Sequence, residues 1–154
     1  MAVAASFIRL HNEMLKGLVP AATKGGGRAL NAFLAENGRS VAEFVGDARV
    51  FSVLLPVLAE EYDIDLETSE NGIVSELAEL CGTLVFILTS EEQDRYSEDL
   101  APTRFSIEDL ADAYEDFTEN DGEGSGEAML SGIKALHQAL SEIDENHVVV
   151  VAVG

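Results

Sequence analysis

A run of β-branched residues late in the chain constrains the fold more than any other feature. Residues 147–153 read His-Val-Val-Val-Val-Ala-Val. Because valine is stiff at χ1, four valines in succession favour a strand over a helix. A strand needs a neighbour for its backbone amides, and the apolar segment 84–89 is the best candidate. We therefore expect a small two-stranded element that involves 84–89 and 147–153.

Helical periodicity dominates the rest of the sequence. Apolar residues recur at helical spacing from Phe7 to Leu18, which predicts a first helix that ends before Pro20. A short second helix is expected around 30–34 and is closed by Gly38. Later segments repeat the pattern, and several of them begin with a residue that can cap the first turn of a helix. The further helices are expected over 40–55, 73–84, from Ser90, over 106–119 and over 125–142. The helix over 40–55 would end before Pro56, and Gly82 interrupts the one over 73–84.

These elements predict a mainly α (α+β) fold. With 154 residues, 47% of them hydrophobic, the chain is long enough to bury a core of its own. No linker is long enough to divide it, so we expect one compact domain over 1–154. That domain would contain five to seven helices and the small two-stranded element.

Charge divides the chain sharply. Residues 1–59 carry six basic and four acidic side chains, a net of +2, whereas 60–154 carry 25 acids and three bases, a net of −22. An imbalance confined to one part of a chain indicates a partner more than a general aid to solubility. Adaptation to high salt is an alternative, but it predicts an acidic surface throughout, and the first 59 residues lean basic.

The segment 106–119 concentrates this acidity. Its apolar stripe runs from Ile107 to Phe117, and no lysine or arginine lies among its acids. Like charges at helical spacing cost a few tenths of a kcal/mol per pair. An ordinary solvated face is one interpretation; the other is a surface that receives a basic partner. The candidate partner-binding residues, two of them in the following loop, are Glu108, Asp109, Asp112, Glu115, Asp116, Glu119, Asp121 and Glu123.

Catalytic, metal and cofactor sites find little support in the sequence. The acidic segments 63–67 and 121–132 each lack a residue that a calcium loop requires. The three histidines are far apart in the sequence and lack the spacing of a helical zinc pair. The glycine-rich segment 24–28 lacks the spacing of a phosphate-binding loop and is interpreted as a flexible connector. We expect no catalytic residue, no metal and no cofactor.

These observations predict a non-catalytic acidic protein that neutralises a basic partner, most simply an immunity-type inhibitor of a toxin or nuclease. One alternative is a phage-type nucleic-acid mimic that inhibits a host defence protein. Another is a small structural or assembly subunit, which would form a homo-oligomer through its C-terminal strand. An enzyme whose site one sequence does not reveal is a third.

Direct nucleic-acid binding is disfavoured because the acidic region would repel phosphates. The most apolar stretch, 73–88, contains two glutamates and is too short for the roughly 20 residues that a membrane span needs. The start of the chain also lacks the pattern of a secretory signal. We expect a soluble, cytoplasmic protein.

Overall fold

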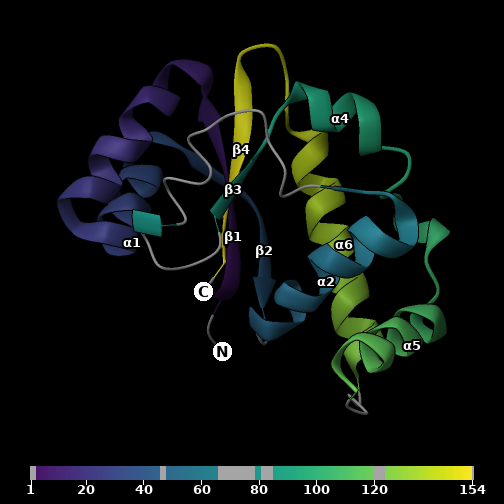
Figure 1. The fold of residues 1–154 in the computed structure, drawn as a ribbon. Coiled ribbons are helices and arrows are strands. Elements are labelled where there is room, and N and C mark those ends of the chain that lie inside the picture. Colours follow the sequence, from purple (N-terminus) through teal and green to yellow (C-terminus); the bar gives the residue numbers. More distant parts are fainter. Residues whose placement is uncertain (1–2, 46–47, 66–78, 81–84, 120–123, 154) are drawn as a thin grey trace.

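A four-stranded antiparallel sheet is the centre of the fold (Figure 1). The computed structural model describes residues 3–45, 48–65, 79–80, 85–119 and 124–153. The strand order is β2-β1-β4-β3, and every neighbouring pair is antiparallel. The strands are β1 (Val3–His11), β2 (Arg39–Val45), β3 (Val85–Leu88) and β4 (His147–Val153).

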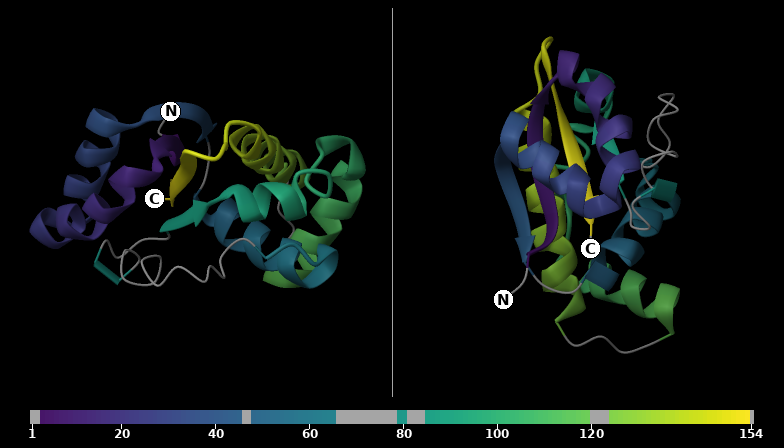
Figure 2. Two further views of the ribbon diagram at one scale, coloured as in Figure 1. Left: turned by 90° about the horizontal axis from the view of Figure 1, so that it is seen from above. Right: turned by 90° about the vertical axis from the view of Figure 1, so that its left-hand side faces the viewer.

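Helices cover both faces of the sheet, which gives three layers (Figure 2). α1 packs on one face together with a short 3₁₀ helix, and α2, α4, α5 and α6 lie on the opposite face. The α-helices are α1 (Leu18–Asn37), α2 (Ala48–Tyr62), α4 (Ser90–Tyr96), α5 (Ile107–Thr118) and α6 (Ser125–Ser141). Two short 3₁₀ helices are η1 (Asn12–Gly17) and η2 (Pro102–Arg104).

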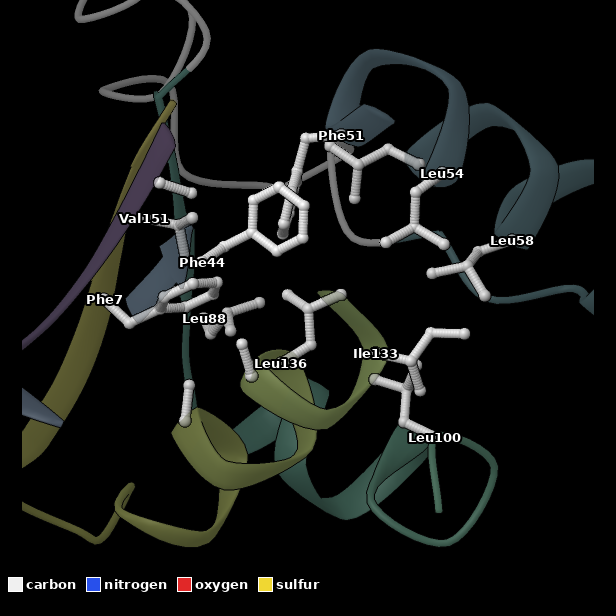
Figure 3. Close-up of a cluster of buried hydrophobic side chains, with 14 of the residues drawn as sticks. Phe7, Phe44, Phe51, Leu54, Leu58, Leu88, Leu100, Ile133, Leu136 and Val151 are labelled. Atoms are coloured by element: carbon white, nitrogen blue, oxygen red, sulfur yellow. The ribbon is translucent and has the colours of Figure 1, made fainter. Parts of the chain in front are cut away.

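The valine run is explained by burial on both faces of the sheet. Val149 and Val151 point into the larger core beneath α2 and α6, whereas Val148 and Val150 point into the smaller core beneath α1. Successive side chains of a strand alternate between faces, so a central strand in a three-layer fold is apolar throughout. Figure 3 shows the larger core, where Phe7 of β1 lies near Phe44, Phe51, Leu88, Leu136 and Val151.

The prediction of a mainly helical fold with a two-stranded element is wrong. The structure is an α+β fold with four strands, because Val3–His11 and Arg39–Val45 are strands rather than parts of helices. The apolar residues of β1 had fitted a helical period by coincidence. In the strand, Ala5 and Phe7 face the larger core, while Leu10 faces the smaller one.

Proline also misled the sequence prediction. Pro56 lies inside α2, which continues to Tyr62. A proline within a helix costs about 3 kcal/mol, but α2 is buried on much of its surface. The burial of Phe51, Leu54 and Leu58 outweighs that cost, since each large side chain contributes about 1.5–3 kcal/mol.

Other elements match their predictions. β3 and β4 pair from Val85↔Ala152 to Leu88↔Val149. Gly38 closes α1, and its N–H donates to the carbonyl of Leu34. The predicted flexible connector at 24–28 differs from its prediction: it lies inside α1 as a kink, where Gly26 adopts φ +67° and joins two helical halves. The helix predicted over 73–84 lies outside the described residues, apart from residues 79–80.

A glycine in α6 permits the close approach of α5. A Cβ atom on Gly126 would overlap the backbone carbonyl oxygen of Ile107, at the start of α5. The carbonyl belongs to the backbone of a packed helix, so it cannot move aside as the end of a side chain can. Gly126 thus sets how closely the first turns of α5 and α6 pack.

We predict that Gly126→Ala lowers the free energy of unfolding by about 1–3 kcal/mol, the usual cost of overpacking. Helix propensity alone would predict the opposite result, because alanine is more favourable than glycine in a helix by up to about 1 kcal/mol. Urea unfolding measures the change. Ser131→Ala, at an exposed position of α6, is the control. A stabilised Gly126→Ala variant would contradict the packing described.

Candidate functional site

The end of α2 is fixed by a tight helix-terminating turn. Asp63 adopts the left-handed conformation with φ +57°, and the N–H of Ile64 donates to the carbonyl of Leu58 over 2.9 Å. This hydrogen bond closes a turn of seven residues, from Leu58 to Ile64, and the side chain of Ile64 is buried. The turn holds Glu60, Glu61 and Tyr62 in the last turn of the helix.

An aromatic contact brings the start of α5 to this point. The rings of Tyr62 and Phe105 have centroids 4.9 Å apart with their planes at 58°. The next residue, Ser106, caps α5 by accepting a hydrogen bond from the N–H of Asp109 over 3.3 Å. The Tyr62–Phe105 contact therefore joins the end of α2 to the start of α5.

Two adjoining depressions lie between these helices, with volumes of about 280 Å³ and 240 Å³. Acidic side chains from both helices line them, and Tyr62 and Phe117 supply aromatic surface. We call this feature the acidic cleft, defined by Val57, Glu60, Glu61, Tyr62, Asp109, Asp112, Ala113, Asp116 and Phe117. Three of the predicted residues, Asp109, Asp112 and Asp116, belong to it.

The predicted residues of α5 are all exposed. Glu108, Glu115 and Glu119 lie outside the acidic cleft on the same helix as its three aspartates. In the described part of the chain, the ion pairs are Arg9–Asp144, His147–Asp144, Arg95–Glu91 and Arg104–Asp99, and none of them includes a carboxylate of α5. The predicted Asp121 and Glu123 lie outside the described residues.

The apolar stripe of α5 is only partly buried. Leu110 is fully buried, but Ile107 is 45% exposed and Phe117 is 47% exposed. The helix rests on α6 and α2 at the outside of its layer, so a narrower face is covered than its periodicity suggested (Figure 1). Two large apolar side chains therefore accompany the carboxylates at the surface.

The arrangement of charge disfavours α5 as an isolated helix. Glu115 and Asp116 lie near its C-terminal end, where the helix dipole favours positive charge, and no basic residue occupies its last turn. Glu119 ends the helix with φ +60°, a conformation that ordinary side chains rarely adopt. These features at the C-terminal end do not stabilise the helix, whereas Glu108 and Asp109 in its first turn do suit the helix dipole.

The acidic cleft perturbs Tyr62. Burial raises the pKa of its phenol above 10.0, and the negative charges of Asp109 and Glu61 raise it further. Sequence analysis identified the α5 residues of the cleft but missed Glu60, Glu61 and Tyr62. Their acidic run was visible in the sequence, but the Tyr62–Phe105 contact that brings it to α5 joins residues 43 positions apart.

Charge also differs between the two helical layers. Residues 12–37, which form η1 and α1, carry three basic and two acidic side chains. Residues 90–119, on the other side of the sheet, carry eleven acids and two arginines. The acidic surface therefore lies on the helical layer opposite to α1. Adaptation to high salt would instead predict acidic helices on both faces of the sheet.

Comparisons with protein-family models, with curated proteins and with solved structures find no match to this chain. Among the described residues, no group of three or more histidine, cysteine or acidic side chains is placed to hold a metal ion. The described helices include none that is both long and apolar enough to cross a membrane. A functional assignment therefore depends on the chemistry of the surface.

We predict that Asp109→Asn lowers the pKa of Tyr62, because one of the negative charges that disfavour the phenolate is removed. The pH titration of tyrosine signals by NMR measures the shift for each of the three tyrosines. Glu115→Gln, a change of equal charge on the same helix outside the cleft, is the control and leaves Tyr62 nearly unchanged. Equal shifts in both variants would show that Asp109 has no special proximity to Tyr62.

Proposed function

We propose that this protein is a non-catalytic inhibitor that neutralises a basic partner, most simply an immunity-type inhibitor of a toxin or nuclease. The observation that carries the proposal is the exposed set of carboxylates on α5, none of which forms an ion pair with another described residue, together with those of the acidic cleft. A partner with a phosphate-binding site would offer the complementary positive charge.

The surface has the features that a specific protein interface requires. Carboxylates steer a basic partner and fix its orientation, while buried apolar and aromatic groups supply most of the affinity. Ile107 and Phe117 are the exposed apolar groups of α5. Lysines or arginines of the partner would enter the acidic cleft, where the ring of Tyr62 adds a surface for cation–π contact.

The alternatives are less well supported. A mimic of duplex nucleic acid needs negative charge over most of its surface, whereas the α1 layer carries slightly more basic than acidic residues. An assembly subunit that pairs through its C-terminal strand needs a free edge. β4 pairs with β1 and β3 within the chain, and the edge strand β2 has an irregular register, which hinders pairing with another chain.

Neutralising four acids of α5 tests the proposal. The variant carries Asp109→Asn, Asp112→Asn, Glu115→Gln and Asp116→Asn, and it is compared with wild type in affinity capture from the native host, followed by calorimetry with the captured partner. We expect a folded variant that loses the basic partner. The matched control removes the same charge elsewhere, at exposed Glu13, Glu36, Glu43 and Glu145, and retains binding.

Equal losses in both variants would show that net charge alone attracts the partner, and equal retention would show that α5 is not the interface. A captured partner that still binds nucleic acid in the complex would exclude inhibition at its phosphate site. A partner displaced by nucleic acid supports such inhibition.

We also predict that affinity for the partner falls at least tenfold when salt rises from about 0.1 M to about 0.5 M, because the Debye length shortens from about 10 Å to about 4 Å. The association rate, measured by stopped flow, should carry much of the change. An affinity that is indifferent to salt would contradict an electrostatic mechanism and favour the assembly alternative.

A further inference from the structure

Two histidines that are far apart in the sequence lie opposite each other in the central strand pair. His11 is the last residue of β1 and His147 the first of β4, and their Cα atoms are partners in the β1–β4 register. The N–H of Asn12 donates to the carbonyl of Asn146 over 2.8 Å. This bond makes His11 and His147 a non-hydrogen-bonded pair, the arrangement in which opposing side chains come closest.

The two imidazole rings have the separation that a shared metal ion requires. Their centroids are 5.2 Å apart and their planes cross at 81°. With metal–nitrogen bonds of about 2.0–2.1 Å, two imidazoles on one tetrahedral ion have ring centroids about 5 Å apart. The pair lies at the end of the sheet where β4 begins, which is uppermost in Figure 1.

A carboxylate orients one of the rings. Asp144 lies 2.9 Å from Nδ1 of His147, and it also accepts hydrogen bonds from Arg9 over 2.6 Å and from the N–H of Asn146 over 2.8 Å. The bonds from Arg9 and from the Asn146 amide fix the orientation of this carboxylate beside the His147 ring. It therefore accepts the Nδ1 proton of His147 and leaves the Nε2 lone pair free, as in many metal-ligating histidines.

We propose that His11 and His147 form a binding site for a divalent late transition-metal ion, such as Ni²⁺ or Zn²⁺, with water as the remaining ligands. Imidazole is a preferred ligand of these ions, whereas Mg²⁺ prefers oxygen. His147 is 28% exposed, which allows the ion and its water ligands to enter. The site is independent of the acidic cleft and of the proposed inhibitory function.

Metal binding has a defined consequence for His11. In the structure, Nδ1 of His11 accepts the N–H of Glu13 over 3.2 Å and caps η1. Ligation through Nδ1 uses the same lone pair, and ligation through Nε2 requires a proton on Nδ1. Either mode breaks the bond from Glu13, so the Glu13 amide reports on occupation of the site.

Titration of the full chain with Ni²⁺ in a large excess of Mg²⁺ tests the proposal, because Mg²⁺ occupies carboxylate sites elsewhere on this acidic protein. Calorimetry gives the affinity, and paramagnetic broadening of imidazole NMR signals gives the location. The chain has three histidines, and His137 on α6 is an internal reference. We expect one Ni²⁺ per chain and broadening of His11 and His147 before His137.

Substitution separates ligation from non-specific binding. His11→Gln and His147→Gln should each lower the affinity for Ni²⁺ at least tenfold, and Asp144→Asn about tenfold, while the matched control His137→Gln leaves it unchanged. Circular dichroism confirms that each variant is folded. Unchanged affinity in both His11→Gln and His147→Gln, or no saturable binding in Mg²⁺, would overturn the proposal.

A measurement on the wild-type chain tests the site without any substitution, so that it does not depend on whether the variants fold. Diamagnetic Zn²⁺ should shift the Glu13 amide signal, since its bond to His11 is lost, and removal of the Zn²⁺ with a chelator should reverse the shift. A Glu13 amide that does not respond at saturating Zn²⁺ would equally overturn the site.

Discussion

The pairing of β1 with β4 is the interaction on which the rest of the structure depends. These strands form the middle of the sheet, and each of them places buried apolar side chains in both cores. Phe7 and Val151 face the helices that carry the acidic surface, whereas Leu10 and Val150 face α1. Both cores therefore pack against the same pair of strands, and neither helical layer can form its contacts if β1 and β4 do not pair.

The stability that this packing supplies explains how the helical layer with α5 can carry so much negative charge. α5 has a single fully buried side chain, Leu110, and it is held by the glycine approach to α6 and by the Tyr62–Phe105 contact rather than by favourable charges of its own. Its exposed carboxylates repel one another, and the large core beneath α2 and α6 supplies the stability that they do not. Because its carboxylates repel one another, this surface is best suited to bind a partner that carries positive charge.

The sequence identified elements whose signals are local. Ser106 caps α5, Gly38 closes α1, and the valine run pairs with 85–88, because each depends on residues close together or on one strong pattern. β1 was missed because its apolar side chains face both cores and their spacing also fits a helix. β2 was missed because it is an edge strand in which Phe44 is the one fully buried side chain among its described residues, so its apolar pattern is weak. The Tyr62–Phe105 contact and the His11–His147 pair depend on long-range packing, which no local pattern encodes.

The central claim is that the negative charge of α5 is not compensated by basic side chains among the residues that the structure describes. Urea unfolding at low salt tests it most directly, with the four-site neutral variant of α5 compared with the control that loses four charges elsewhere. The account predicts that the α5 variant gains about 1 kcal/mol over the control as like-charge pairs are removed, and that the gain shrinks at high salt. A loss of stability in the α5 variant alone would mean that its carboxylates support the fold, and it would contradict the account.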